Sequence, residues 1–360
     1  MKKNIAIIGI VGLPATYGGF ETLAEYITKY LTDDYHITVY CSSKHYENQI
    51  KLYNGAELRY INLHANGIQS IPYDIFSIIK AWKNSDTLLI LGVSGCIALP
   101  IIKIFGKKKV IVNIDGLEWK RQKWTKYAKL FLKFSEALAV KYADVVITDN
   151  KVIQDYVKEE YGKKSELIAY GADHVKKIEI SDNLFKKFAF LKNRYAFTVC
   201  RIEPENNIHI LLNAFKEFKG LTLVIIGNWS KSDYGKQLQL QYSEEENIFL
   251  IDPIYNQTIL DQIRSNCYLY LHGHSAGGTN PSLVEAMYLQ LPILAFDVSY
   301  NRATTEDKAY YFQNPNELTD LLENVVSNKI NLEECAQKMH HIAKQNYLWE
   351  KIANHYAETF

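Results

Sequence analysis

The chain has 360 residues, of which 48% are hydrophobic and 22% are charged, and its 41 basic and 40 acidic side chains leave a formal net charge of +1. This length favours two domains with a core each, and the composition excludes disordered, collagen-like and coiled-coil chains. The near-zero net charge argues against a protein whose main partner is nucleic acid. Aromatic residues reach 13%, which suits sugar faces and membrane interfaces as well as cores.

Five cysteines are scattered along the chain without the spacing of a zinc site or a disulfide framework, so we expect a reducing cytoplasm and no metal. The basic start of the chain leads into the short apolar run Ile5–Gly9, which indicates a first strand rather than a signal peptide. The apolar stretch Thr87–Gly106 is long enough for a membrane span, but Gly92 and Pro100 interrupt it. We therefore expect a buried strand, a turn and a short helix there.

Short apolar runs alternate with helical patterns along most of the chain. The predicted strands are Ile5–Ile8, Ile37–Cys41, Leu58–Ile61, Thr87–Leu91, Val110–Ile114, Val145–Thr148, Phe197–Cys200, Leu223–Ile226, Ile248–Leu250, Leu269–Leu271 and Ile293–Phe296. Helices are predicted at Phe20–Leu31, Tyr73–Trp82 and Lys126–Tyr142. This alternation indicates α/β domains with parallel sheets at residues 1–170 and 195–344, joined by a lysine-rich linker at 171–194.

Two glycines, Gly18 and Gly19, come between the first strand and the first helix. They allow backbone N–H groups at a helix N-terminus to approach a diphosphate. The fingerprint G-x-G-x-x-G is absent, and Ser42 stands where an acidic ribose ligand would follow the second strand, so we expect neither NAD nor FAD. An ordinary strand-to-helix turn is the alternative.

A helix and an anion site are predicted within the segment His272–Met287. Asn280 suits an N-cap and Pro281 the first helical position, so the helix is expected to run to about Gln290. The pair Gly277–Gly278 ahead of it leaves backbone N–H donors uncovered, which suits the phosphates of a nucleotide-sugar.

Polar side chains of the same segment are candidates for contacts with the sugar. Glu285, about one turn inside the helix, can accept hydrogen bonds from two ribose hydroxyls, although an acidic residue here also simply complements the helix dipole. His272 and His274 are two residues apart with no further ligand in view. Packing or a hydrogen bond to the sugar is expected of them rather than metal binding.

Four blocks in chain order carry a family resemblance: Pro14–Thr22, Asn113–Arg121, Arg201–Asn207 and Gly277–Ala286. With them the chain resembles a retaining glycosyltransferase of the GT-B fold in the large family-four group. More narrowly, it is similar to bacterial rhamnosyltransferases that build capsule and exopolysaccharide. The resemblance implies an α/β fold with two Rossmann-like domains facing a central cleft, and a C-terminal helix within 345–360 that packs back on the first domain.

The resemblance also implies which residues bind the donor. Arg201 would pair with the diphosphate, because its fork can hold two phosphate oxygens, although a surface ion pair with Glu203 or Glu205 is the alternative. The broad family has a Lys where this chain has Asn206, and a Glu where it has Gly277. The full set of implied donor-binding residues is Gly18, Gly19, Arg201, His274, Gly277, Gly278, Thr279, Asn280, Glu285 and Arg302.

Asp115 and Glu118 are the candidate catalytic residues, because they follow the fifth predicted strand at an edge where ligand loops gather. Asp115 precedes a glycine and would stand on a loop, where it can orient an acceptor hydroxyl or stabilise charge on the donor sugar. Ordinary turn formation is the alternative. No D-x-D motif occurs. The resemblance implies metal-independent transfer with retention of configuration, without a cofactor besides the nucleotide-sugar substrate.

Basic and aromatic residues alternate from Trp119 to Phe134. Those expected at an acceptor or membrane contact are Trp119, Lys120, Arg121, Lys123 and Trp124. In the helix that follows, lysines 126, 129 and 133 share one face, and the apolar residues Tyr127, Leu130, Phe131 and Phe134 share another. This pattern suits an anionic membrane surface or a lipid diphosphate, and the alternative is a helix with its apolar face in the core. No single-stranded nucleic-acid-binding pattern accompanies it.

The sequence therefore predicts a glycosyltransferase that is peripheral on the cytoplasmic face of the membrane. The expected donor is dTDP-L-rhamnose, with UDP-linked hexoses as alternatives, and the expected acceptor is a saccharide on undecaprenyl diphosphate. Two other classes stay open. Asn206 and Gly277 motivate a catalytically silent GT-B subunit that binds a nucleotide or a partner, and a GT-B nucleotide-sugar epimerase is the other.

Overall fold

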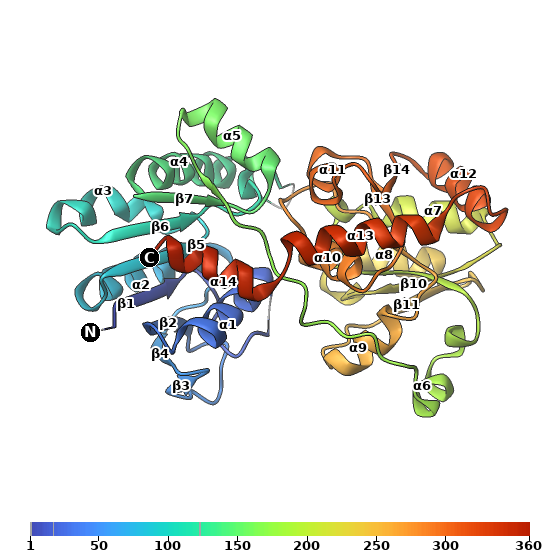
Figure 1. The fold of residues 1–360 in the computed structure, drawn as a ribbon, viewed down its shortest axis with the longest axis horizontal. Coiled ribbons are helices and arrows are strands. Elements are labelled where there is room, and N and C mark those ends of the chain that lie inside the picture. The colour runs from blue at the N-terminus through green and yellow to red at the C-terminus, as the bar shows by residue number, and fades with distance from the viewer. Residues whose placement is uncertain (1, 17, 122–123) are drawn as a thin grey trace. The chain divides into compact units, whose positions relative to one another are not determined.

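The computed structural model describes residues 2–16, 18–121 and 124–360, and they divide into two compact units (Figure 1). Unit 1 comprises Met1–Tyr170 and Trp349–Phe360, and unit 2 comprises Gly171–Leu348.

Unit 1 is built on an eight-stranded sheet in the order β3-β4-β2-β1-β5-β6-β7-β8, parallel except for the β3–β4 pair. The strands are β1 Asn4–Ile8, β2 His36–Ser42, β3 Leu52–Tyr53, β4 Ala56–Ile61, β5 Thr87–Leu91, β6 Lys109–Asn113, β7 Val145–Thr148 and β8 Glu166–Leu167. Six of them were predicted. The two-residue strands β3 and β8 were not, because so short a strand leaves no periodic pattern.

The helices of unit 1 are α1 Gly19–Leu31, α2 Ser70–Asn84, α3 Leu99–Ile102, α4 Lys126–Tyr142, α5 Lys151–Tyr161 and α14 Trp349–Glu358, with short 3₁₀ turns η1 Gly67–Gln69, η2 Cys96–Ala98, η3 Lys103–Phe105 and η4 Glu118–Lys120. The apolar stretch 87–106 is thus a buried strand followed by short helical turns, as predicted. Across the described ranges, no helix is long and apolar enough to cross a membrane.

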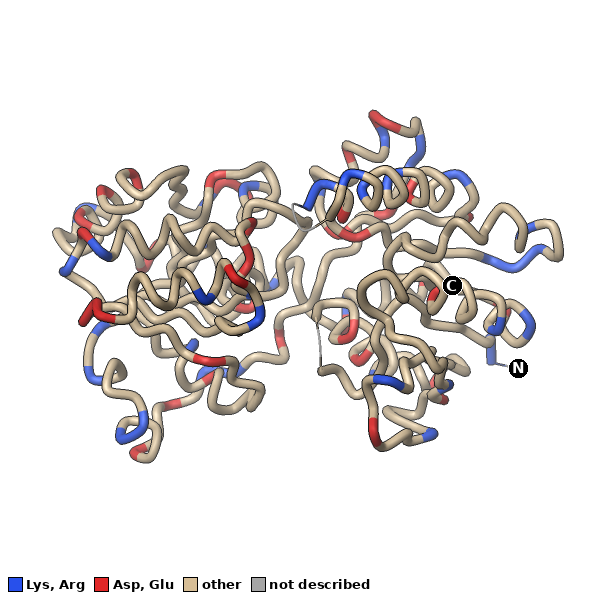
Figure 2. The backbone as a smooth tube through the Cα atoms, turned by 180° about the vertical axis from the view of Figure 1, so that it is seen from behind, with Lys and Arg blue, Asp and Glu red and all other residues tan. Residues whose placement is uncertain are grey.

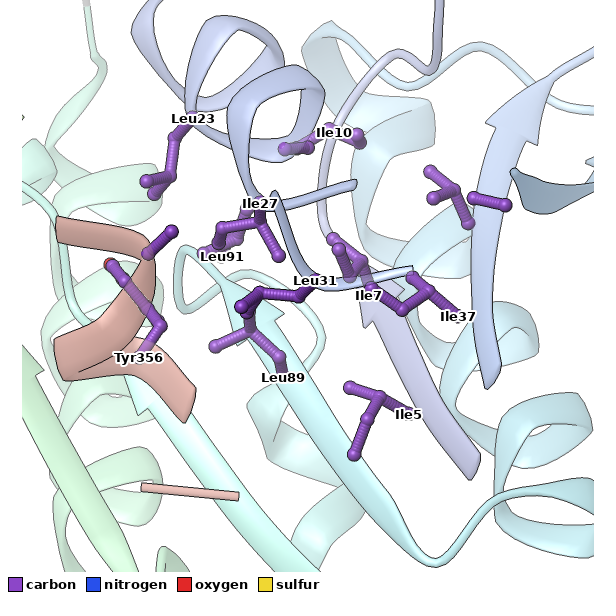
Figure 3. Close-up of a cluster of buried hydrophobic side chains, with 14 of the residues drawn as sticks. Ile5, Ile7, Ile10, Leu23, Ile27, Leu31, Ile37, Leu89, Leu91 and Tyr356 are labelled. Atoms are coloured by element: carbon purple, nitrogen blue, oxygen red, sulfur yellow. The ribbon is translucent and has the colours of Figure 1, made fainter. Parts of the chain in front are cut away.

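The core of unit 1 joins segments from both ends of the chain (Figure 3). Leu23 and Ile27 of α1 lie one turn apart and are fully buried over the sheet beside Ile7 of β1. Each such side chain contributes about 1.5–3 kcal/mol to folding by burial. Helix α14 adds Tyr356 to the same cluster and packs on α1, where the ring of Trp349 stacks on that of Tyr26 at 4.4 Å.

Unit 2 has a fully parallel six-stranded sheet in the order β11-β10-β9-β12-β13-β14. Its strands are β9 Tyr195–Val199, β10 Thr222–Ile226, β11 Ile248–Ile251, β12 Leu269–His272, β13 Ile293–Phe296 and β14 Tyr310–Phe312. Its helices are α6 Asp182–Lys187, α7 Ile208–Glu217, α8 Asp233–Tyr242, α9 Gln257–Arg264, α10 Pro281–Tyr288, α11 Ser299–Thr305, α12 Pro315–Val326 and α13 Leu332–Asn346, with 3₁₀ turns η5 Ala189–Lys192, η6 Pro204–Asn206 and η7 Trp229–Lys231.

Residues 171–194, which we expected to form a linker, group with unit 2. The backbone N–H groups of Lys176 and Ser181 donate hydrogen bonds of 3.1 and 2.8 Å to the side chains of Asp261 and Gln262 on α9. These bonds tie the segment to the surface of the second domain, which its lysine-rich composition did not indicate.

Two parallel sheets with helices between successive strands confirm the predicted α/β fold with two Rossmann-like domains. In each sheet the winding reverses beside one strand: β1 lies between β2 and β5, and β9 lies between β10 and β12. Open α/β sheets bind ligands outside the carboxyl ends of the strands at such a reversal.

Candidate functional site

The loops after β9 and β12 are bonded to each other at the reversal point of the unit 2 sheet. The backbone N–H and the hydroxyl of Ser275 both donate to the carbonyl of Glu205 at 2.9 Å. The side chain of Asn207 donates to the carbonyl of Gly273 at 2.9 Å. These bonds bring the block that begins at Arg201 and the glycine pair at 277–278 to one edge, although about 70 residues separate them in the sequence.

Helix α10 begins as predicted, with Asn280 as N-cap and Pro281 in the first turn. The side chain of Asn280 accepts from the backbone N–H of Ser282 at 3.2 Å. Gly277 has a φ of +117°, which side chains rarely allow. Within the described ranges, the backbone N–H groups of Gly277 and Gly278 donate to no protein acceptor. The arrangement can receive an anion at the positive end of the helix.

Arg201 stands on the exposed loop after β9, and no residue of the described chain forms an ion pair with its guanidinium. The pair with Glu203 or Glu205 that we considered is therefore not formed. The side-chain amide of Asn206 instead donates to the backbone carbonyl of Arg201 at 2.5 Å. The residue in the family's lysine position thus holds the loop that presents the arginine.

Glu285 lies in a buried ionic network. One of its oxygens pairs with the guanidinium of Arg264, and the other accepts from Nε2 of His174 at 3.1 Å. Arg264, which is itself buried, also holds Asp261 at 2.7 Å. Burial by itself would raise the pKa of Glu285, but the charge of Arg264 and the contact with His174 outweigh it and lower this pKa to about 2.

This network keeps Glu285 ionised at neutral pH. Each carboxylate oxygen has two lone pairs, so each can accept one more hydrogen bond beside its present partner. The side chain of Glu285 is 15% exposed, which leaves an approach for a hydroxyl group. A hydroxyl group of the ribose can therefore reach Glu285, but the sequence had not indicated that a buried Arg264 orients the carboxylate.

The other polar candidates of this edge have different environments. His272 is fully buried and its ring stacks on that of His274 at 4.4 Å, and burial lowers the pKa of His272 to about 3. It therefore packs as a neutral ring. Thr279 is buried just ahead of α10. The carbonyl of His274 accepts from the side chain of Asn301 on α11 at 2.9 Å, which anchors the loop from the other side.

Arg302 is engaged elsewhere. Its guanidinium holds both oxygens of Asp297, at 2.5 and 2.9 Å, and bonds Asp307 at 3.0 Å. The same group lies over the ring of Tyr311. A guanidinium occupied in this way has no free fork for a diphosphate, so we withdraw Arg302 from the donor site.

In unit 1, two carboxylates of α1 hold the loop that precedes the helix. Glu21 accepts from the backbone N–H of Val11 at 2.8 Å, and Glu25 accepts from that of Ala15 at 2.7 Å. Gly18 is the N-cap, with a φ of +94°, and Gly19 is the first helical residue. The predicted glycine turn is thus a pre-formed loop at a helix N-terminus.

Glu21 is buried beneath this loop. Burial, together with the nearby negative charge of Asp115, raises the pKa of Glu21 to about 7, although two backbone N–H groups oppose the shift. Glu21 lies in the first turn after β1 and Asp115 follows β6, so both residues are at the carboxyl edge of the parallel strands of unit 1. Sequence reasoning passed over Glu21, because an acidic residue in a first turn is common.

Asp115 occupies a strained turn after β6. Its φ is +59° and that of Leu117 is +53°, conformations that are costly for residues with side chains and that concentrate at functional sites. The backbone N–H of Asp115 donates to the side-chain oxygen of Asn113 at 3.1 Å. The amide of the same Asn113 donates to the hydroxyl of Tyr356 at 2.8 Å, so α14 supports the turn.

Glu118, the second candidate carboxylate, is held by its neighbours. Arg121 pairs with it at 2.8 Å, and the indole N–H of Trp124 donates to it at 2.9 Å. The two candidate carboxylates thus differ in setting, since Glu118 is held by Arg121 and Trp124 while Asp115 stands on the strained turn after β6.

The remaining acceptor or membrane candidates also have partners within unit 1. Trp119 donates to the buried carboxylate of Glu136 at 3.1 Å, and Lys120 lies over the ring of Trp119. Lys123 lies outside the described residues. Among the residues that the structure describes, no group of three or more His, Cys, Asp or Glu side chains could hold a metal ion.

The two halves of the chain match two different family models. Residues 2–173 match a domain of unknown function, DUF1972. Residues 180–346 match the family Glycosyl transferases group 1. The chain carries a group 1 glycosyltransferase domain. No curated protein sequence matches the chain.

Solved structures similar to this chain include the sucrose-phosphate synthase of Thermosynechococcus elongatus, with a TM-score of 0.82 at 14% identity, covering 99% of this chain and 98% of the other. HepE of Anabaena, solved in complex with UDP-glucose, has a TM-score of 0.75 at 16% identity and 99% coverage of both chains. The trehalose-6-phosphate synthase OtsA has a TM-score of 0.72 at 11% identity, covering 99% and 98%. These likenesses establish the GT-B fold.

Proposed function

We propose that this group 1 glycosyltransferase moves L-rhamnose from dTDP-L-rhamnose to a saccharide carried on a lipid diphosphate, with retention of anomeric configuration, in capsule or exopolysaccharide synthesis at the cytoplasmic face of the membrane. The observation that carries the proposal is the edge of unit 2 at which Arg201, without an ion-pair partner in the described chain, and the N–H groups of Gly277 and Gly278 come together. A diphosphate matches that combination of a cation and backbone donors.

The donor is assigned to unit 2. Arg201 and the N-terminus of α10 neutralise the diphosphate, and the ionised Glu285 accepts a hydrogen bond from the free 3′-hydroxyl of the deoxyribose. The charge that develops on the leaving diphosphate is stabilised by the same groups, which need no rearrangement during the reaction. We propose that this transfer requires no metal ion.

The acceptor is assigned to unit 1, with Asp115 as the carboxylate that orients the attacking hydroxyl. In the reaction the bond from the anomeric carbon to the diphosphate oxygen breaks, and the acceptor oxygen bonds to that carbon on the same face. The acceptor proton passes to the departing diphosphate oxygen. Charge on the sugar is greatest at the transition state, where the Asp115 carboxylate stabilises it.

A UDP-linked hexose is the second candidate donor, and it is favoured by one observation: HepE, which shares this fold, was solved with UDP-glucose. The narrower resemblance of the Pro14–Thr22 and Gly277–Ala286 blocks to rhamnosyltransferases supports dTDP-L-rhamnose instead. The two donors differ in both base and sugar, so direct competition distinguishes them.

The test is to incubate purified protein with a panel of dTDP- and UDP-sugars and a short-chain glucosyl-diphosphate lipid, and to identify products by mass spectrometry and NMR. We expect transfer from dTDP-L-rhamnose with an unchanged anomeric configuration, and Asp115→Asn should slow it without preventing donor binding. Donor binding without transfer from any donor would contradict the proposal and favour a silent subunit. An epimerised free donor would favour the epimerase.

A further inference from the structure

Six large apolar side chains of unit 1 are exposed on two neighbouring elements, each between 56% and 85% exposed: Ile101, Ile104 and Phe105 on α3–η3, and Tyr127, Leu130 and Phe134 on α4. Helix α3 packs against α4, and the two lie beside each other over the sheet of unit 1 (Figure 1). We call these six side chains the apolar surface. A soluble monomer seldom exposes so many large apolar groups together without a function.

Helix α4 has apolar residues on two of its sides. At about 100° per residue, its buried positions Leu132, Ser135 and Ala139 face the unit 1 core, and the stripe through Tyr127 and Phe134 lies on the opposite side. The core face is therefore complete without the stripe. The sequence left two alternatives for this apolar stripe, a membrane contact or packing in the core. Packing in the core is excluded for Tyr127, Leu130 and Phe134, because their side chains are exposed.

The surroundings of the apolar surface are strongly basic. Residues 96–142 contain eleven basic and three acidic residues, a net charge of +8 in a chain whose total is +1. Two of the three acidic groups are occupied, since Glu136 is buried and Glu118 is paired with Arg121. Lys107, Lys126 and Lys141 are exposed beside the apolar residues, and Figure 2 shows basic residues along η3–β6 and α4.

One lysine of α4 does not contribute to this surface. Lys133 lies over the rings of Trp119, Tyr156 and Tyr161 at 4.7–5.0 Å and pairs with Glu160 at 2.9 Å. It fastens α4 to α5 and to the loop before α4. The exposed cations at the edges of the apolar surface, rather than the whole lysine face of the helix, are the groups available for a partner.

We propose that the apolar surface docks on a lipid bilayer that contains anionic lipids. The six apolar side chains enter the boundary between headgroups and acyl chains, and Lys107, Lys126 and Lys141 contact lipid phosphates. A second copy of the chain is a poorer occupant, because a symmetric contact would bring two sets of the exposed lysines Lys107, Lys126 and Lys141 together. The bilayer offers an apolar interior and the opposite charge at once.

Docking in this way would hold the acceptor end of unit 1 at the membrane. Helix α4 starts after the loop that carries Asp115, and Trp119 of η4 within that loop donates to Glu136 and lies under Lys133 of α4. The Tyr127 end of the apolar surface is the end that follows the Asp115 loop in the chain. The inference rests on the proposed function in one respect: docking on the membrane brings the enzyme to its acceptor only if that acceptor is linked to a lipid.

The test measures flotation of the full chain with vesicles of phosphatidylcholine, with and without phosphatidylglycerol, in the absence of donor and acceptor. We expect binding only when phosphatidylglycerol is present. The variants Ile104→Ser/Phe105→Ser, Leu130→Ser/Phe134→Ser and Lys107→Glu/Lys126→Glu should each weaken partitioning by about tenfold or more. Leu240→Ser and Lys216→Glu, exposed changes of the same kind in unit 2, should bind like the wild type.

Hydrogen exchange of the unaltered protein provides a measurement without substitutions. Vesicles should protect segments 99–105 and 126–134 and leave α8 unchanged. Absence of wild-type binding to anionic vesicles, or normal binding by all three patch variants, would overturn the proposal. A wild-type dimer that the variant Ile104→Ser/Phe105→Ser converts to a monomer would also overturn the proposal, because the apolar surface would then be a dimer interface. Because no substrate is present, a lack of transfer activity bears on the proposed function alone.

Discussion

The side-chain amide of Asn113 donates a 2.8 Å hydrogen bond to the hydroxyl of Tyr356, 243 positions later in the chain. Both side chains are buried, and Asn113 also accepts from the backbone of Asp115. The C-terminal helix is therefore part of the support for the turn that carries the candidate acceptor-side carboxylate. This contact links the end of the chain to the turn that carries Asp115.

Removing that hydroxyl should loosen the turn. In Tyr356→Phe the ring stays in the core but the amide of Asn113 loses its partner, which costs about 1–3 kcal/mol of unfolding free energy. We expect a lower transfer rate with little change in donor affinity, measured by urea unfolding, steady-state kinetics and calorimetry. Tyr255→Phe, which removes an exposed hydroxyl of unit 2, is the control. Equal stability of Tyr356→Phe and the wild type would show that the bond contributes nothing.

Arg201 should account for much of the affinity for the donor diphosphate. Charge-assisted hydrogen bonds contribute about 1.5–3 kcal/mol, so Arg201→Ala is expected to weaken binding of dTDP or UDP at least about tenfold in calorimetry. Arg201→Lys should recover only part of the loss, because an ammonium group cannot hold two oxygens in a planar fork. Lys216→Ala, another exposed cation of unit 2, should leave affinity unchanged. Unaltered binding by Arg201→Ala would remove this residue from the phosphate site.

Glu285 should stabilise unit 2 in a pH-dependent way. Its pKa is lowered to about 2 in the folded state against 4.5 for an ordinary Glu, so its contribution is complete above about pH 4.5 and disappears as the pH falls through 2. Glu285→Gln leaves Arg264 buried with one charged partner fewer, a loss of about 3–5 kcal/mol at neutral pH. Urea unfolding from pH 7 to pH 3 should show the gap between variant and wild type narrowing below pH 4.5. A gap that stays constant would contradict the network.

Glu21 should act on unit 1 in the opposite direction. Its folded pKa of about 7 lies above the ordinary 4.5, so its stabilising contribution is complete below pH 4.5 and is lost as the pH rises through 7. Glu21→Gln still offers an oxygen to the backbone N–H of Val11 but does not titrate. We expect the wild type to lose on the order of 2 kcal/mol more than the variant between pH 5 and pH 8 in urea unfolding. Parallel pH profiles for the two proteins would exclude a buried, titrating Glu21.

Much of the fold could be predicted from local patterns. Strands β5, β7 and β13 and helix α4 have the bounds that the sequence predicted, and α10 begins at the Asn280–Pro281 signal. Short apolar runs and capping residues act over a few positions, so they can be recognised without knowing what packs on them. The glycine pairs at 18–19 and 277–278 can also be recognised from the sequence, because glycine allows backbone conformations that other residues rarely adopt.

The sequence by itself thus determined the two parallel-sheet domains and the loops in which candidate residues gather, because the alternation of strands and helices and the capping signals are local. Only the tertiary structure decided what each side chain is bonded to. It paired Arg302 with Asp297, set Arg264 and His174 around Glu285, and left the outer stripe of α4 uncovered. Each of these contacts depends on which distant segment of the chain packs beside the residue. An amphipathic pattern or a single charged residue does not identify that segment.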